Sequence, residues 1–426
     1  NRMGKSHSAR WLPTWNVSGA WNAHEEKFFS NLTSVLSHFT LKASYSLTAD
    51  RGPADVTNSQ AIITSYSPYR PFTSIQESGL YIKELENSEL TYEKKHELNI
   101  GADMGFLNNR INLAVDWYKR NNYDLIGIVN TQGAGGQILK YANIASMKSH
   151  GIEFTLSTKN IKTKDFNWNT DFIFSNAKNE VTDLKQNANV MELISGNGFA
   201  KQGYPVRGLF SIPFVGLDKD GIPVIINEKG EATSTDINFQ ERQNTGFLKY
   251  EGPTDPTITG SLGNMFSYKG FRLNLFITYS FGNVIRLNPV FKAYYSDLTA
   301  MTREFKNRWT LPGDEAKTNV PAILSKRMYD SNEDLKYAYN AYNYSTERIA
   351  KGDFIRLKEI SLAYDFPKAW INPLKLTDLS LKVQATNLFL IYADDKLNGQ
   401  DPEFFNAGGV ASPVPRQFTI TLRLGL

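Results

Sequence analysis

The residue types that could carry acid–base, nucleophilic or metal chemistry are few in this sequence and are not spaced for it. The chain has 426 residues and no cysteine, which excludes a thiolate metal site and a cysteine nucleophile. None of its five histidines stands in the H-E-x-x-H or H-x-H spacing that is typical of metal ligands. We therefore expect no metal site, no cofactor and no catalytic cysteine or histidine.

Carboxylate pairs are the remaining candidates for acid–base chemistry. Two pairs, Glu25 with Glu26 and Asp314 with Glu315, contain the side chains that glycoside hydrolysis requires. A chain with 43 acidic residues contains such pairs by chance, and both pairs fall between the expected strands. We therefore predict that the chain is not an enzyme.

The segment Asp218-Lys219-Asp220-Gly221 begins like a calcium-binding loop. An EF-hand needs a bidentate acid at its twelfth position, where this sequence has Lys229. The segment is more typical of a tight turn between two short strands, residues 215–217 and 222–226. We predict a β-hairpin here.

A tyrosine-rich segment, residues 329–344, is better suited to binding than to catalysis. Aromatic rings stack on sugar rings, and the asparagine amides between them can bond to hydroxyl groups. A second interpretation stays open, in which the tyrosines pack a long loop against its neighbours or against a partner protein, because tyrosine is common at protein interfaces. The candidate contact residues are Tyr329, Tyr337, Tyr339, Tyr342 and Tyr344.

The elements that must position these residues are strands, because the dominant periodicity of the chain is two residues. In residues 271–282 and 417–426, apolar side chains alternate with polar ones almost throughout. A strand of this kind separates an apolar from a polar environment. Eleven stretches show the pattern: residues 12–22, 42–49, 96–106, 111–123, 145–158, 166–175, 257–268, 271–285, 354–366, 379–392 and 417–426.

The length of these stretches favours strands that cross a membrane. Most reach ten residues or more, whereas a strand of a soluble protein has about five or six. A tilted strand that crosses a bilayer needs roughly 9–11 residues. No apolar run approaches the roughly 18 residues that a membrane-spanning helix needs. We expect an all-β chain, a transmembrane antiparallel β-barrel of about eleven strands.

The connections between the strands support a barrel. Short connections such as residues 107–110 and 269–270 alternate with long ones, as the short inner turns and long outer loops of a transmembrane barrel do. One connection on the short side, residues 23–41, is longer, and the spacing of Phe28, Phe29, Leu32, Val35 and Leu36 indicates a small amphipathic helix at the inner rim. The long extracellular loops are expected at about residues 50–95, 124–144, 176–256, 286–353 and 393–416.

Aromatic residues with apolar neighbours at a spacing of two are candidates for the membrane interface. Amphipathic rings favour the level of the lipid headgroups, where barrels carry girdles of aromatic side chains. The candidates are Trp15, Trp21, Trp117, Trp168, Tyr268, Tyr279 and Tyr364.

The number of strands and the charge of the chain limit its organisation and its partners. A single-chain bacterial barrel has an even number of strands, and two edge strands facing lipid are not viable. We therefore expect residues 1–426 to be the C-terminal part of one longer barrel domain, with further strands supplied from outside this sequence. Basic and acidic residues nearly balance, 47 against 43, which gives no reason to expect a nucleic-acid partner.

Seven segments carry a pattern that extends over the whole chain. They are RWLPTWNVSGAWN (residues 10–22), LTYEKKHELNIG (90–101), SMKSHGIEF (146–154), NRW followed by PGDE (307–309 and 312–315), DFIRLKEISL (353–362), GQDPE (399–403) and PRQFT (415–419). In this order they resemble the C-terminal half of the SusC/RagA-type, TonB-linked outer-membrane transporters of the Bacteroidota.

The resemblance implies more than the periodicity does. It implies a 22-stranded barrel with an N-terminal plug, located as a multi-pass protein in the outer membrane of a Gram-negative bacterium and in contact with its lipid. It also implies a SusD-like surface lipoprotein over the outer mouth, and import of oligosaccharides or peptides driven by TonB. The plug, the N-terminal strands and the segment that binds TonB are all expected to lie outside this sequence.

Two other functions stay open beside import. A SusC-like barrel can serve as a structural subunit of a larger outer-membrane complex. A soluble all-β protein that binds or cleaves glycans belongs to a different class, and partition of the protein into water without detergent would favour it.

Overall fold

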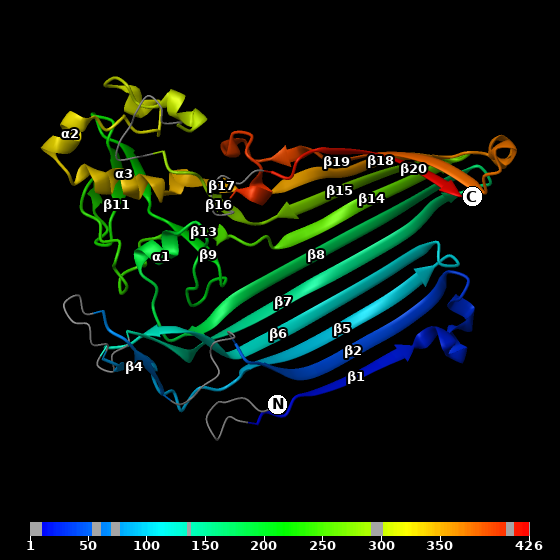
Figure 1. Ribbon diagram of the computed structural model, residues 1–426, viewed down its shortest axis with the longest axis horizontal. Coiled ribbons are helices and arrows are strands. Elements are labelled where there is room, and N and C mark those ends of the chain that lie inside the picture. Colours follow the sequence, from blue (N-terminus) through cyan, green and yellow to red (C-terminus); the bar gives the residue numbers. More distant parts are fainter. Residues whose placement is uncertain are drawn as a thin grey trace.

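The computed structural model of the protein describes residues 11–52, 61–69, 77–133, 138–290, 301–405 and 413–425. Its main feature is one large antiparallel sheet of eleven strands (Figure 1). The strands are β1 (Trp15–Asn22), β2 (Leu36–Asp50), β5 (Glu93–Phe106), β6 (Ile111–Asn130), β7 (Leu139–Lys162), β8 (Phe166–Leu184), β14 (Ile258–Tyr268), β15 (Phe271–Phe281), β18 (Phe354–Asp365), β19 (Asp378–Ala393) and β20 (Gln417–Gly425). They pair in this order, and each overlaps one of the eleven stretches predicted from the alternation.

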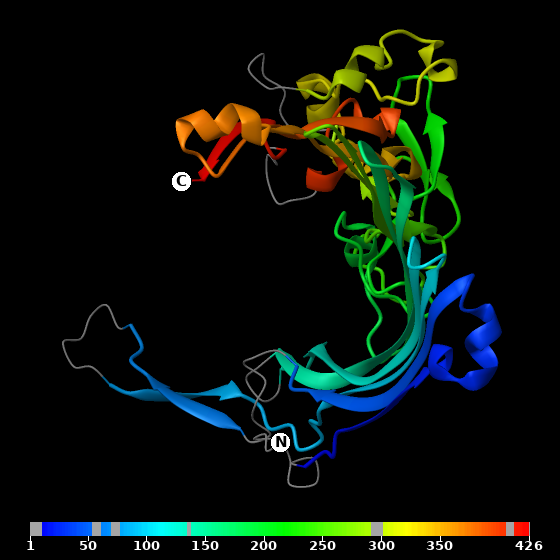
Figure 2. The same ribbon diagram turned by 90° about the vertical axis from the view of Figure 1, so that its right-hand side faces the viewer.

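The sheet is open and curved. Figure 2 shows it bent into a C, and within the described residues β1 and β20 each pair on one side only. Figure 1 shows short turns at one end of the strands and long connections at the other. The short connections therefore gather at one end of the sheet and the long connections at the other, as their alternation in the sequence predicts.

Residues that pair across the sheet place one apolar face along all of its strands. Directly paired residues of antiparallel strands point to the same side, so a shared register gathers side chains of one kind. Trp117 of β6 lies opposite Ile100 of β5 and Ile152 of β7. At the other edge, a row runs through Phe271, Tyr364, Leu381 and Leu422.

The opposite face is mainly polar and carries ion pairs between strands. Lys42 of β2 lies 2.9 Å from Asp103 of β5, and Arg272 of β15 lies 2.9 Å from Asp365 of β18. Tyr118 of this face lies over Gly151, where a side chain on the neighbouring strand would collide with its ring. The sheet thus has one apolar and one polar face, as the sequence predicts.

The hairpin of β6 and β7 is longer than predicted. The expected loop at residues 124–144 is largely strand, because β6 continues to Asn130 and β7 starts at Leu139. Asp124 has a positive φ of 56°, and the register shifts between Asn122 and Leu125. This β-bulge breaks the alternation in the sequence while the pairing continues, which is why the prediction ended the strand too early.

The connection from β1 to β2 also differs from the prediction. It consists of two short 3₁₀ helices, η1 (Ala23–Glu25) and η2 (Lys27–Leu32), instead of one amphipathic α-helix. β2 begins at Leu36, before the predicted start. Within the described residues, no helix is long and apolar enough to cross a membrane.

The remaining elements lie mostly in the long connections. Two small strands, β3 (Ile62–Tyr66) and β4 (Gly79–Glu84), form a hairpin of their own. The others are α1 (Val190–Ile194), β9 (Gly208–Ser211), β10 (Phe214–Leu217), β11 (Pro223–Ile226), β12 (Ala232–Thr233), β13 (Lys249–Pro253), β16 (Val284–Arg286), η3 (Arg303–Asn307), η4 (Asp314–Ala316), α2 (Lys326–Ser331), α3 (Leu335–Asn343), η5 (Thr346–Arg348), β17 (Ile349–Lys351), α4 (Lys368–Ile371), η6 (Asn372–Leu374), η7 (Asp395–Leu397) and η8 (Pro402–Phe404).

Candidate functional site

Two long connections, between β8 and β14 and between β15 and β18, pack together into one body at the long-loop end of the sheet (Figure 1). We call this the loop body; it comprises the described parts of residues 185–257 and 282–353. Its largest apolar core contains Leu193 from α1, Phe210 from β9 and Ala341 from α3. Because α3 belongs to the second connection, the core joins both of them.

Five tyrosines of the loop body were predicted to contact a ligand or a partner. Tyr339 and Tyr342 have exposed fractions of only 1% and 2%. The Tyr339 hydroxyl donates to the carbonyl of Ala322 at 2.9 Å, and the Tyr342 ring lies edge-on to Phe214. Burial raises the pKa of Tyr342, so this phenol stays protonated. In this structure both rings pack the loop body, which is the second interpretation that the sequence left open.

The other three tyrosines remain candidates for contact. Tyr337 of α3 is 39% exposed, and Tyr329 and Tyr344 are half-buried. Their contact with a substrate or a partner stays a prediction.

A buried arginine fastens the loop body. Arg286 of β16 is 6% exposed, and its guanidinium donates to the carbonyls of Phe210, Ser345 and Ile194 at 2.6, 2.9 and 3.3 Å. Desolvation lowers the pKa of Arg286 to about 9 and the charge of Glu251 opposes this shift, so the guanidinium remains charged at neutral pH. One side chain thereby joins segments of both connections.

Two further buried arginines hold neighbouring loop segments. Arg348 lies 2.8 Å from Glu304, which joins the end of η5 to η3. Arg356 of β18 lies 2.6 Å from Asp401 and 3.2 Å from Glu403. The sequence reasoning singled out none of these arginines as a functional residue, although Arg356 and Asp401 stand in two of the segments that carry the family resemblance.

The acidic pair Asp314 and Glu315 stabilises a loop. Asp314 accepts hydrogen bonds from the backbone N–H groups of Thr310 and Leu311, which lower its pKa to about 2. Glu315 accepts from the indole N–H of Trp309 at 2.9 Å, which lowers its pKa as well. Both carboxylates are ionised at neutral pH, so neither is a proton donor there.

The turn at Asp218–Gly221 is a hairpin turn, as predicted. One Asp218 carboxylate oxygen accepts from the backbone N–H groups of Asp220 and Ile222, and β10 pairs with β11 on either side of it. Gly221 has a positive φ and lies directly against the ring of Trp309, where a Cβ atom would collide with it. Among the residues that the structure describes, no group of three histidine or acidic side chains could hold a metal ion.

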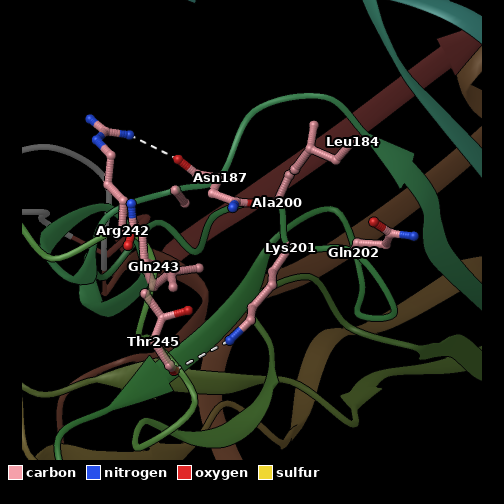
Figure 3. A pocket seen from close by; sticks show the side chains of 10 residues that line it. Leu184, Asn187, Ala200, Lys201, Gln202, Arg242, Gln243 and Thr245 are labelled. Atoms are coloured by element: carbon pink, nitrogen blue, oxygen red, sulfur yellow. Dashed lines mark hydrogen bonds between the residues drawn. The ribbon is translucent and has the colours of Figure 1, made fainter. Parts of the chain in front are cut away.

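A pocket of about 180 Å³ lies at the base of the loop body (Figure 3). Its two cationic residues do not converge on the space between them. Figure 3 shows Lys201 extending toward Thr245, whose carbonyl lies 3.4 Å from the ammonium, and Arg242 extending toward Asn187, to whose carbonyl it donates at 2.8 Å. Burial lowers the pKa of Lys201. The pocket is therefore a gap between packed loop segments, and we assign it no ligand.

The seven aromatic residues predicted at the membrane interface all lie on the apolar face of the sheet. Those near the short-turn ends of their strands are Trp21, Trp168, Tyr268 and Tyr364. Trp15 and Tyr279 lie near the long-loop ends of β1 and β15, and Trp117 lies within β6 and belongs to neither group. Their place at the lipid headgroups stays a prediction.

No family model matches the chain. Curated proteins resemble it over nearly its whole length. It is 25% identical to the TonB-dependent receptor P3 of Formosa agariphila over an alignment of 423 positions, gaps included, that covers 95% of this chain and 39% of the relative. It is 26% identical to the TonB-dependent receptor SusC of Bacteroides thetaiotaomicron over an alignment of 448 positions, gaps included, that covers 99% of this chain and 40% of SusC. The chain thus spans about two fifths of the length of these relatives.

Solved structures show the same fold. The RagAB peptide transporter matches 99% of this chain with a TM-score of 0.75 at 24% identity, and the chain covers 44% of it. The RagAB peptide importer in its open-open state matches the whole chain with a TM-score of 0.77 at 23% identity. These relatives are receptors and transporters, in agreement with the prediction that the chain is not an enzyme. By sequence and by fold, the chain is similar to the SusC/RagA type of TonB-dependent receptors, and it corresponds to the C-terminal half of their barrel.

Proposed function

We propose that this chain supplies half of the barrel wall and the outer loops of a transporter in the outer membrane of a Gram-negative bacterium of the Bacteroidota. The transporter imports oligosaccharides or peptides, driven by TonB and together with a SusD-like surface lipoprotein. The plug and the other barrel half complete it. The observation that carries this proposal is the eleven-stranded sheet with one apolar and one polar face, because such a wall can meet lipid on one side and a wet interior on the other.

The comparisons support the mechanism of import but leave its cargo open. Several relatives are named as TonB-dependent receptors, and one solved relative is named as a peptide transporter. The aromatic and amide side chains of residues 329–344 suit sugars as well as peptides. Exposed apolar side chains on the loop body, among them Val215 and Leu311, are consistent with a protein partner over the outer mouth.

The test is uptake by the bacterium that carries the gene. Deletion of the gene is expected to abolish uptake of one class of labelled oligosaccharides or peptides, and a plasmid copy is expected to restore it. Normal uptake of every class in the deletion strain, with loss of a larger outer-membrane complex instead, would contradict import and favour the structural-subunit function.

A variant tests the contact residues within this proposal. Tyr337→Ser removes an exposed ring from the loop body and is expected to lower uptake several-fold. Tyr69→Ser is the matched control, because Tyr69 is an exposed tyrosine of another long connection. Equal uptake by the two variants would remove Tyr337 from the site.

A further inference from the structure

The connection between β1 and β2, residues 23–35, exposes large apolar side chains where a turn in water would carry polar ones. Phe28, Leu32 and Val35 have exposed fractions of 65%, 53% and 57%. Phe28 and Leu32 belong to η2, and Val35 directly precedes β2, so all three lie within one short connection. We call residues 23–35 the foot.

The foot is fixed to the sheet, so this exposure is built into the fold. Phe29 is 3% exposed and stacks on Phe39 of β2, with ring centres 6.3 Å apart. The ring Nδ1 of His24 lies 3.1 Å from the carbonyl of Phe39, and the indole N–H of Trp21 donates to Glu26 at 3.1 Å. The side chain next to the exposed Phe28 thus anchors the segment.

The foot lies on the same side as the apolar face of the sheet. The Phe28 ring lies 6.2 Å from Trp21, which belongs to that face. Figure 2 shows the foot on the convex side of the curved sheet, and Figure 1 shows it at the short-turn end. Phe28 therefore continues the apolar surface of β1 and β2 beyond the ends of the strands, and Leu32 and Val35 are exposed in the same connection.

We propose that the foot is a membrane-interface element, which inserts Phe28, Leu32 and Val35 into the leaflet nearest the short turns. The partner is the boundary between phospholipid headgroups and acyl chains, where amphipathic segments bury an apolar face to a depth of roughly 5–10 Å. Glu25 and Lys27, which are exposed beside the apolar face, stay among the headgroups. The foot thereby sets the depth of the barrel wall in that leaflet. This inference rests on the membrane location proposed above.

The test uses single cysteines, because the chain has none of its own. Phe28→Cys and Leu32→Cys are labelled with an environment-sensitive fluorophore, and the protein is placed in phosphatidylcholine vesicles. Quenching is measured with a nitroxide near the lipid headgroup, with a nitroxide at the end of the acyl chain, and with aqueous iodide. Glu25→Cys is the matched control in the same connection, and Val17→Cys, on the apolar face of β1, reports insertion of the sheet.

The labels at residues 28 and 32 are expected to be quenched several-fold more by the headgroup-proximal nitroxide than by iodide. The label at residue 25 is expected to be quenched more by iodide than by that nitroxide. If the label at residue 17 responds to lipid but those at 28 and 32 respond to iodide, the foot is in water and the inference is wrong. If those two labels are shielded from both quenchers, a protein covers the foot, which also overturns the inference. If residue 17 does not respond to lipid, the membrane location itself fails.

Discussion

Three buried arginines explain, at the scale of single residues, how long loops form a defined body. Each guanidinium presents several donors in a fixed geometry, so one side chain can satisfy acceptors from several segments. Arg286 and Arg348 act within the loop body, and Arg356 connects β18 to the connection before β20. Charged residues are mostly exposed in folded proteins, so nothing in the sequence indicates that these three arginines are buried.

The pair of Arg356 and Asp401 should contribute much more to stability than a surface pair. Both side chains are almost fully buried, so Arg356→Gln leaves an uncompensated carboxylate, at a cost of about 3–5 kcal/mol. Arg272→Gln is the control, because its partner Asp365 is half-exposed and such pairs contribute about 0–1 kcal/mol. Urea unfolding in detergent and hydrogen exchange of residues 394–405 measure the difference. An equal loss of stability in the two variants would contradict the larger contribution of the buried pair.

The loop at Trp309 should loosen in acid. The pKa of Asp314 is about 2 when folded and 3.8 in its ordinary state, so its hydrogen bonds stabilise the loop above pH 3.8. That contribution is lost as the pH falls through about 2. Protease cleavage within residues 307–318, measured from pH 5 to pH 2, should increase over this window. The Asp314→Asn variant should be cleaved readily at pH 5 as well as at pH 2. If the pH dependence of cleavage is the same in that variant as in the unchanged protein, Asp314 is not its cause.

At the scale of elements, the strands depend on close approach between neighbours. Gly260 of β14 lies under the ring of Tyr279 of β15, whose hydroxyl donates to the Ile173 carbonyl of β8 at 2.8 Å. Gly260→Ala places a methyl group against both, and overpacking of this kind costs about 1–3 kcal/mol. Gly19→Ala is the control, because nothing lies within 4 Å of its Cβ position. Thermal unfolding of the sheet measures both variants, and a loss at Gly19 as large as that at Gly260 would argue against the packing explanation.

The elements also show which local signals a sequence carries. The alternation predicted all eleven strands of the sheet, because each strand faces two environments along its whole length. It missed the continued pairing after Asp124, because a bulge shifts the pattern by one position. It also overstated the helix in the foot: Phe28 and Leu32 have α-helical spacing, but residues 27–32 form a 3₁₀ helix in which Phe29 is the residue that is buried.

At the scale of the whole molecule, the fold was predictable and the loop body was not. The sheet follows from pairing between neighbours in the chain, whereas the loop body depends on distant contacts such as that between Arg286 and Phe210. Tyr339 and Tyr342 illustrate the same limit. A tyrosine suits a ligand site and a packed loop equally well, and only the tertiary structure shows that these two rings are buried.

The arrangement of the sheet argues against the soluble all-β alternative at this scale. The apolar face of the sheet presents exposed side chains, including Val17, Leu381 and Val383, and no second sheet lies over it within the described residues. A soluble sandwich buries such a face against another sheet. In a transmembrane barrel, lipid covers such a face.

The most direct test of the claim that the sheet is a membrane-spanning barrel wall is to measure the environment of successive residues along one strand. Spin labels placed at successive residues from 380 to 386 of β19, in the protein in lipid vesicles, report collision with oxygen, which is soluble in lipid, and with a water-soluble nickel chelate. We expect oxygen to dominate at Leu381 and Val383, and the chelate at Lys382 and Gln384, with a period of two residues. Access of the chelate to every position, or the same response at all of them, would contradict a membrane-spanning wall.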